Sequence, residues 1–507
     1  MKRSLFHLLS GAVFALSFSF VALVLAQETI AYPDAFPPLT LQTVDSAAGT
    51  LAPTGSDTGK STSLSGNSVT VHSGGSVPGR VYGAINLNDS DIVSGNRVLI
   101  NGIVEGRAAY GGYHYFATGN IATVGNVVTV SNGTVNDVYG GEVVIPSGTG
   151  TSADNSVTIS GGTVDWSIRG GAAWSNFGAV TATDNSVVIN SGTVYGDVYG
   201  GVAWSTFVTA NASSNSVTIN GGTIRGNVSG GEAIGIGTAA NNTVTVRGAP
   251  TFDTRTVFYG GRIPSGGVST GNVLNLYSAN LTVGEVDSFQ SMNFYLPATL
   301  TVGGTMLTIV ASPGITSGAV NIAGVTVNVG LDGAGLLLRT GDRFILIDAC
   351  ELRGDFRSIS GTIGGYAYTV MKEGNRLVLI IGDLKSGPSR DYTGQWHKPD
   401  EDNWGLTVLQ NFPGNRRYLF VPWYTYDSSG KAAWYIFQGD NWSGVDTISA
   451  DVYRYTGPAW GVMPYDNDRI TNAKIGTAKL TFTSATTARF EYDVEGSSRT
   501  IDLRKLE

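Results

Sequence analysis

The sequence predicts an all-β protein: a right-handed parallel β-helix, or β-solenoid, followed by a small antiparallel β barrel or sandwich. Three observations predict this fold class. A unit of 27 to 30 residues recurs along the first half of the chain, and 70 of the 507 residues are glycine while only 14% are charged. Six of the nine tryptophans lie after residue 391. Glycine-rich and β-branched sequence of low charge is typical of turn-rich β structure.

Residues 1–26 have the pattern of a secretory signal peptide. They begin with Lys2 and Arg3, continue as an apolar run, and carry Val24 and Ala26 at the small positions before a cut ahead of Gln27. The alternative is an uncleaved membrane anchor, because the apolar run is long. After cleavage we expect no membrane-spanning segment, and residues 27–60 would form an N-terminal leader or cap. The protein would then be exported through the inner membrane to the cell surface, the outer membrane or the medium.

The repeat occupies residues 61–280, in about eight units. Each unit reads roughly N-S-V-T-I-x-G-G-T-V-x-G-x-V-Y-G-G-x-A and then continues into a loop of changing sequence. Short alternating apolar stretches between glycines predict short strands joined by tight corners. One such unit buries little alone, whereas stacked units bury a continuous core, so the repeat predicts a solenoid with three strands per coil. The β-branched residues exclude helical solenoids, and propeller blades are the weaker alternative.

One asparagine begins each unit, and we expect these residues to form a structural ladder. Stacked amide side chains hydrogen-bond from one coil to the next, so the column needs no ligand to explain it. Tyrosines before the glycine pairs share a second phase and predict a ladder of stacked rings. The asparagines are Asn67, Asn96, Asn126, Asn155, Asn185, Asn215, Asn242 and Asn272.

Aromatic residues also gather in the variable segments after the glycine pairs. Trp174 and Trp204 are one repeat apart, as are Phe177 and Phe207, so each pair should lie on adjacent coils. Such a strip either covers an end of the core or associates with neighbours, or it binds sugar rings or another protein. The candidate binding residues in this strip are Tyr113, Tyr115, Trp174, Phe177, Trp204 and Phe207.

Charge and cysteine content limit the partners. A net charge of −8 argues against nucleic acid and against electrostatic binding to anionic lipid. The single cysteine, Cys350, lies in the apolar context FILIDACEL, so we expect a buried structural thiol and no intramolecular disulfide. We expect no cofactor and no metal, because His, Cys and acidic residues show no metal-ligand spacing.

Residues 281–383 are expected to end and cap the solenoid. Their text includes FQSMNFYLP, GGTML and LLLRTGDRFILIDAC. Together with the repeats, residues 60–385 resemble the passenger regions of autotransporter adhesins from Gram-negative bacteria, whose β-helix ends in a compact β module. The resemblance implies a surface-exposed stalk used for adhesion or aggregation. Autotransporters finish with a membrane-spanning barrel, which needs more residues than remain here, so we expect another route across the outer membrane.

Residues 384–390 form a predicted linker, and residues 391–507 a Trp-rich β domain. The stretches YTGQWHKPDEDNWG and LFVPWYTYDSSGKAAWYIFQG resemble a module of uncertain function in secreted proteobacterial proteins. The usual W-W-x-P-x-E-S-G-W-G pattern is altered here, with His397 in place of the second tryptophan and Asp402-Asn403 in place of Ser-Gly. Alternating strands with DSSG and EGSS turns predict antiparallel hairpins. Trp423 and Trp434 are the candidates for stacking on sugars.

Enzymatic and ice-binding functions are also considered. Parallel β-helices include polysaccharide-degrading enzymes, which need facing carboxylates. Asp137 and Asp197 share a repeat phase but are more simply turn formers, and the polar cluster around His397 is expected to be a solvated loop. Threonine columns could bind ice, but Leu99, Val188 and Asn275 interrupt one of them. We expect no catalytic residue.

The sequence therefore predicts an exported, non-catalytic, adhesin-like protein with a β-helical stalk that presents aromatic loops. Its partner would be a host or neighbouring-cell surface component or a glycan, and exposed solenoid ends would favour self-association. The alternative is a carbohydrate-binding protein that acts through the C-terminal Trp-rich domain, with the stalk as a spacer.

Overall fold

The computed structural model describes most of the chain after residue 62 and a short strand before it. The predicted signal peptide and most of the predicted leader therefore lie outside the described residues. The described residues are 42–44, 63–77, 79–87, 90–116, 118–264, 266–314, 316–333, 335–410, 417–459, 461, 464 and 466–506.

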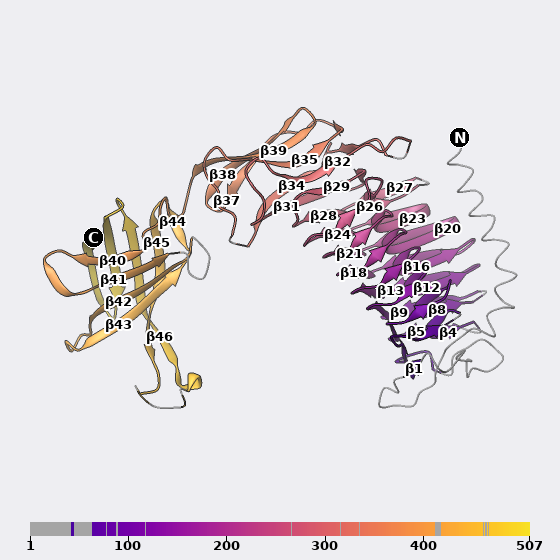
Figure 1. Ribbon diagram of the computed structural model, residues 1–507, viewed down its shortest axis with the longest axis horizontal. Helices are drawn as coiled ribbons and strands as arrows, with labels where there is room; N and C mark the ends of the chain where they lie inside the picture. Colours follow the sequence, from indigo (N-terminus) through magenta and orange to yellow (C-terminus); the bar gives the residue numbers. More distant parts are fainter. Residues whose placement is uncertain are drawn as a thin grey trace.

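Three parallel sheets run the length of a β-solenoid, which Figure 1 shows as the indigo-to-pink stack. The fold class predicted from the repeat is confirmed. Sheet 1 has eleven strands, and eight of them begin directly after a ladder asparagine. They are β1 (Gln42–Val44), β2 (Ser68–Val71), β6 (Arg97–Ile100), β10 (Val127–Val130), β14 (Ser156–Ile159), β18 (Ser186–Ile189), β21 (Ser216–Ile219), β24 (Thr243–Val246), β28 (Val273–Leu276), β31 (Ser291–Pro297) and β34 (Thr326–Asp332).

Sheet 2 consists of seven two-residue strands at the Gly-Thr-Val part of the repeat. They are β3 (Ser76–Val77), β7 (Ile103–Val104), β11 (Thr134–Val135), β15 (Thr163–Val164), β19 (Thr193–Val194), β22 (Thr223–Ile224) and β25 (Thr251–Phe252).

Sheet 3 carries the glycine pairs. Its main path comprises β4 (Val81–Asn86), β8 (Ala108–Tyr115), β12 (Asp137–Ile145), β16 (Ile168–Ser175), β20 (Val198–Ser213), β23 (Val228–Ala240), β26 (Val257–Arg262), β30 (Glu285–Asp287), β33 (Ala319–Asn321) and β36 (Glu351–Arg353). Side branches are β5 (Val93–Ser94), β9 (Asn120–Val124), β13 (Thr149–Ala153), β17 (Ala179–Thr183) and β27 (Gly267–Thr270).

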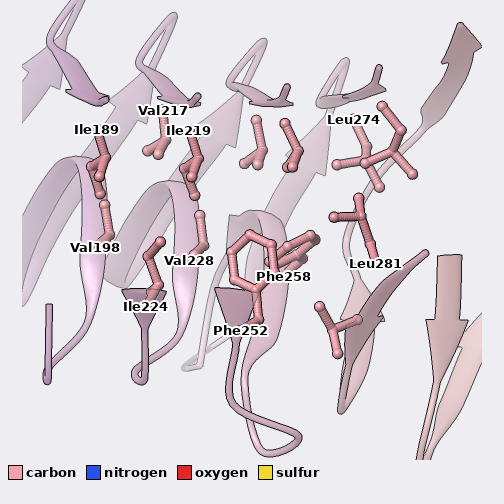
Figure 2. Close-up of a cluster of buried hydrophobic side chains, with 14 of the residues drawn as sticks. Ile189, Val198, Val217, Ile219, Ile224, Val228, Phe252, Phe258, Leu274 and Leu281 are labelled. Carbon is pink, nitrogen blue, oxygen red and sulfur yellow. The ribbon is translucent and has the colours of Figure 1, made fainter. Parts of the chain in front are cut away.

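The pairing is in register from coil to coil, which stacks like residues on like. Val157 of β14 pairs with Val187 of β18, which pairs with Val217 of β21. In each repeat coil, sheet 1 points two aliphatic side chains inward and sheets 2 and 3 point one each, and Figure 2 shows Ile219, Ile224 and Val228 meeting inside one coil. These side chains are fully buried, and burial of each contributes roughly 1.5–3 kcal/mol. The core is thus a stack of aliphatic layers.

The segments expected to be variable loops are strands for most of their length, and in this respect the prediction of three strands per coil was incomplete. After the glycine pair, β12 and β16 continue outward, and β13 and β17 return along the same sheet. Between them lies a second, smaller core made largely of alanine, with Ala173, Ala203 and Ala233 at equivalent positions. Small side chains let the two layers approach closely, so each coil carries a side lobe rather than a free loop.

Beyond residue 280, sheets 1 and 3 continue, and a mixed six-stranded sheet joins the stack. Its strands, in spatial order, are β29 (Leu281–Val283), β32 (Thr305–Ile309), β35 (Arg343–Ala349), β39 (Arg376–Leu384), β38 (Tyr366–Glu373) and β37 (Ile359–Ile363). The first three are parallel, and β39 pairs antiparallel with β35. Phe344, Leu377 and Leu379 join the solenoid core, so this sheet covers apolar side chains that a bare end would expose.

The C-terminal domain is a closed antiparallel barrel of eight strands, because β43 pairs with β45 as well as with β42. Its strands are β40 (Gly394–Lys398), β41 (Glu401–Gln410), β42 (Leu419–Tyr426), β43 (Ala432–Gly439), β45 (Thr447–Thr456), β46 (Thr471–Phe482), β47 (Thr487–Val494) and β48 (Ser497–Lys505), with short β44 (Trp442–Gly444) beside β45 and the 3₁₀ turn η1 (Asn467–Arg469) before β46. Trp396, Phe437 and Phe490 fill the interior. Figure 1 shows the barrel in orange and yellow.

Cys350 does not form the buried thiol that its apolar context predicts. It follows β35 and is exposed. The apolar run FILIDA alternates between the two faces of β35, and the strand ends at Ala349, so the next residue leaves the core. The thiol lies beside the backbone of Gly318, 3.0 Å from where a Cβ on that glycine would be.

Candidate functional site

The eight repeated asparagines form one continuous hydrogen-bonded column inside the solenoid. The Nδ2 of Asn185 donates to the Oδ1 of Asn215 at 3.0 Å, and the backbone N–H of Asn185 donates to the same oxygen at 3.0 Å. The same pair of bonds recurs from Asn67 to Asn272. The column ends on Gln290, whose Oε1 accepts from Asn272 at 3.2 Å. These amides satisfy one another, which leaves them no part in ligand binding.

The glycine pairs let the strands of sheet 3 pass close to this column. A Cβ on Gly141 would lie 2.6 Å from the side-chain amide of Asn155, closer than real Cβ contacts allow. The residues that flank each pair, such as Tyr139 and Glu142, carry their side chains on the other surface of the sheet, away from the aliphatic core. The glycines therefore let sheet 3 approach the asparagine column, while the flanking side chains line the outer surface of the sheet.

A tyrosine column occupies this outer surface. The rings of Tyr82 and Tyr110 are stacked with centroids 4.9 Å apart, and those of Tyr110 and Tyr139 are 4.8 Å apart. Arg169 takes the next position, and its guanidinium lies 4.9 Å from the Tyr139 centroid and 5.5 Å from that of Tyr199. A cation between two ring faces is favourable, so Arg169 continues the column instead of breaking it.

Buried carboxyl groups accompany the tyrosines. Burial raises the pKa of Glu142 to about 7, against the opposing charge of Arg169. Burial also raises the pKa of Glu232, although Arg262 forms an ion pair with it. Both carboxyl groups are buried among their neighbours on the outer surface of sheet 3, so they belong to a packing layer on that surface.

Asp137 and Asp197, the same-phase acids of the repeat, bind the backbone of the following coil. Asp137 accepts from the N–H of Ser167 at 3.1 Å, and Asp197 accepts from the N–H of Asn227 at 2.6 Å. Asp137 also pairs with Arg169 at 3.4 Å. The two aspartates therefore serve at turns between coils.

The structure brings together both predicted aromatic pairs of the side lobes. The rings of Trp174 and Trp204 are 5.8 Å apart edge to face, and those of Phe177 and Phe207 are stacked at 5.1 Å. Phe177 and Phe207 are each 65% exposed. Trp174, Trp204 and Tyr115 are only partly exposed and Tyr113 is buried, because they pack over the outer surface of sheet 3. Of the six aromatic residues predicted to form a binding strip, Phe177 and Phe207 are therefore the two most accessible to a partner.

Aliphatic residues that sequence reasoning missed extend this exposed pair. Val208 follows Phe207, Ile236 lies beside Thr209 on the next coil, and Val268 pairs with Thr238 on the coil after that. All three are exposed, Ile236 the most. Ile236, an apolar residue between two glycines in the stretch AIGIG, was the available signal. We call Phe177, Phe207, Val208, Ile236 and Val268 the coil-edge ridge.

The two barrel tryptophans fall on opposite sides of the wall. Trp423 is 4% exposed and contacts the rings of Tyr435, Phe490 and Tyr492, so it belongs to the core and offers no face to a ligand. Trp434 is 52% exposed. Tyr424, the residue after Trp423, and Tyr426 are exposed on the outer face together with Trp434. The period-2 alternation of the strand separates these positions.

The polar cluster near His397 is an ion-pair network on the barrel surface. Lys398 contacts Asp400 at 2.7 Å and Glu401 at 3.3 Å, and Arg499 pairs with Glu401. Hydrogen bonding from Arg499 lowers the pKa of Glu401 to about 2. The indole of Trp404 donates to Glu401 at 3.1 Å. Within the described ranges, no group of three or more His, Cys, Asp or Glu side chains is arranged to hold a metal ion.

Comparison with protein families, curated proteins and solved structures gave no significant match. The part of the chain that the structure describes contains no helix with the length and apolar character needed to cross a membrane. The structure itself defines the class of protein as a parallel β-solenoid followed by a closed antiparallel barrel.

Proposed function

We propose that this chain is an exported, non-catalytic, adhesin-like protein of the cell surface or outer membrane or of the surrounding medium. The solenoid is its stalk, and the coil-edge ridge is the surface that contacts a host or neighbouring-cell component. The observation that carries the proposal is the stacked and 65% exposed pair Phe177 and Phe207, continued by Ile236 and Val268 on the next coils. Exposed apolar side chains that gather on neighbouring coils of one surface mark interaction sites.

The regularity of the stalk supports this use. The pairing of β16 with β20 is in register up to Ser175 and Ser205, and the backbone N–H of Phe207 donates to the carbonyl of Asn176 on the preceding coil at 3.1 Å. These contacts fix the spacing of Phe177 and Phe207, so the pair requires little ordering when a partner binds. Phenylalanine, valine and isoleucine offer no hydrogen bonds beyond their backbone, which favours a partner with apolar groups of its own, such as a protein.

The non-catalytic part of the proposal is supported by the state of the acidic residues. Glu142 and Glu232 are buried, and Asp137 and Asp197 accept from backbone N–H groups of the next coil. Hydrolysis of a glycosidic bond needs two carboxyl groups that face an accessible substrate.

Attachment of the purified chain, residues 27–507, to intact cells tests the proposal. Wild-type protein labelled at the exposed Cys350 should bind in a saturable way, and Phe177→Ser with Phe207→Ser should reduce binding at least tenfold. The matched control is Trp166→Ser, which removes an equally exposed ring at another corner of the same solenoid. Equal binding by wild type and the double variant would rule out the ridge.

A further inference from the structure

The outer face of the barrel carries a group of exposed aromatic rings that are separate from the coil-edge ridge of the solenoid. Tyr424 of β42 and Trp434 of β43 are directly opposite each other in the antiparallel register, and Tyr426 lies two residues along β42. Their exposed fractions are 50%, 52% and 49%. Directly opposite side chains on antiparallel strands have Cβ atoms about 4.5–5.5 Å apart, so these rings form one patch. We call Tyr424, Tyr426 and Trp434 the barrel platform.

The platform has an open flank. Gly405 of β41 is the residue opposite Tyr424 on the other side, and it contributes no side chain there. On the far side, Tyr453 of β45 pairs with Ile436 and lies on the same face, partly exposed. The rings are therefore bordered by backbone on one flank and by another tyrosine on the other.

The chemistry of the platform differs from that of the coil-edge ridge. Among the described residues of β42, β43 and β45, every strongly exposed large apolar side chain is a tyrosine or a tryptophan. Each of these combines a flat apolar face with a hydroxyl or indole N–H at its edge. Such side chains also lose little conformational entropy when they are fixed by a ligand. A flat face with polar edges fits a sugar ring, whose C–H groups stack while its hydroxyls hydrogen-bond.

Charges near the platform are compensated. Lys474, opposite Tyr453, pairs with Asp451 at 2.8 Å. Asp427, just after Tyr426, accepts from the backbone N–H groups of Ser429 and Lys431 at 2.8 and 3.1 Å. A surface without an unpaired basic cluster has no particular attraction for an anionic polymer.

We propose that the barrel platform binds a neutral polysaccharide chain by stacking of its sugar rings on Trp434 and Tyr424. This is a second binding site, independent of the coil-edge ridge. It lies outside the barrel, because the interior is filled by side chains such as Trp396 and Phe490.

Native affinity electrophoresis of the full chain tests the proposal. The gels contain hydroxyethylcellulose, xylan or galactomannan as neutral polymers and polygalacturonate as the anionic one. Wild type should be retarded by at least one neutral polymer and not by polygalacturonate. Trp434→Ser and Tyr424→Ser should each weaken that retardation at least tenfold, whereas Trp434→Tyr, which keeps a ring, should retain most of it.

Trp166→Ser is the control for loss of an exposed ring, and it should behave as wild type. Circular dichroism and thermal unfolding verify that each variant keeps its fold. Three results would each overturn the proposal: no retardation of wild type by any neutral polymer, undiminished retardation of Trp434→Ser and Tyr424→Ser, or retardation by polygalacturonate alone. None of them bears on attachment through the ridge, which is measured with the ridge variant.

Discussion

The side-chain oxygen of Asn215 accepts two hydrogen bonds from Asn185 on the preceding coil, one from its Nδ2 and one from its backbone N–H, both at 3.0 Å. Both residues are buried. Each asparagine therefore satisfies two donors of its neighbour while its own amide reaches the next oxygen, and the whole column depends on every member.

Replacement of Asn215 by alanine should lower the free energy of unfolding by about 2–4 kcal/mol, because it leaves two buried donors of Asn185 without an acceptor. The measurement is the urea midpoint followed by circular dichroism. Asn220→Ala is the matched control on the same coil, since its hydrogen bond to Asn190 is exposed. Its effect should be within about 0.5 kcal/mol. Equal effects of the two substitutions would contradict the structural role of the ladder.

The glycine pair predicts a steric effect of comparable size. Gly141→Ala places a Cβ 2.6 Å from the Asn155 amide, so the ladder or strand β12 must shift. We expect a loss of at least about 2 kcal/mol, in the range of overpacked cores. Gly444→Ala is the control, because nothing lies within 4 Å of a Cβ there. Thermal unfolding of the two variants compares them, and a stable Gly141→Ala protein would contradict the close approach.

Glu142 predicts that the solenoid becomes less stable as pH rises. Its folded pKa is about 7 and its ordinary value is 4.5, so the folded state binds the proton more tightly. The stabilisation is complete below pH 4.5 and is lost as pH rises through 7, a change of about 3 kcal/mol at most. The pKa values of Glu232 and Asp137 are also raised by burial, which adds the same sign.

Glu142→Gln keeps the size and shape of the side chain but cannot ionise. Urea midpoints at pH 5 and pH 8 should therefore differ less in this variant than in wild type. Glu373→Gln, at an exposed pair with Arg343, is the control and should leave the difference unchanged. A variant whose pH dependence equals that of wild type would show that Glu142 is not buried as described.

Substitution of the two barrel tryptophans should affect stability to different extents, because one ring is buried and the other is half-exposed. Trp423→Ala removes a core ring and should cost about 3–5 kcal/mol. Trp434→Ala removes a half-exposed ring and should change stability by less than about 0.5 kcal/mol. Guanidinium unfolding followed by fluorescence checks both values, and similar losses would place the two residues on the same side of the barrel wall.

The repeat predicted the solenoid because stacking brings like residues into register. Residues one repeat apart in the sequence, such as Asn185 and Asn215, are therefore neighbours in space. The side lobes were missed because their cores are built from alanine, as at Ala173 and Ala203, which carries little periodic signal. Trp423 and Trp434 could not be assigned to sides by residue type alone. Strand alternation settles the question only once the pairing of β42 with β43 is known.

The most direct test of the account is a crossed comparison of dissociation constants for cells and for the best neutral polysaccharide. The full chain is measured as wild type, as Phe177→Ser with Phe207→Ser, and as Trp434→Ser. The account predicts that the ridge variant binds cells at least tenfold more weakly and keeps its polysaccharide affinity. Trp434→Ser should keep its affinity for cells and bind the polysaccharide at least tenfold more weakly. Cell binding that survives the ridge variant unchanged would contradict the claim that the solenoid edge is the adhesive surface.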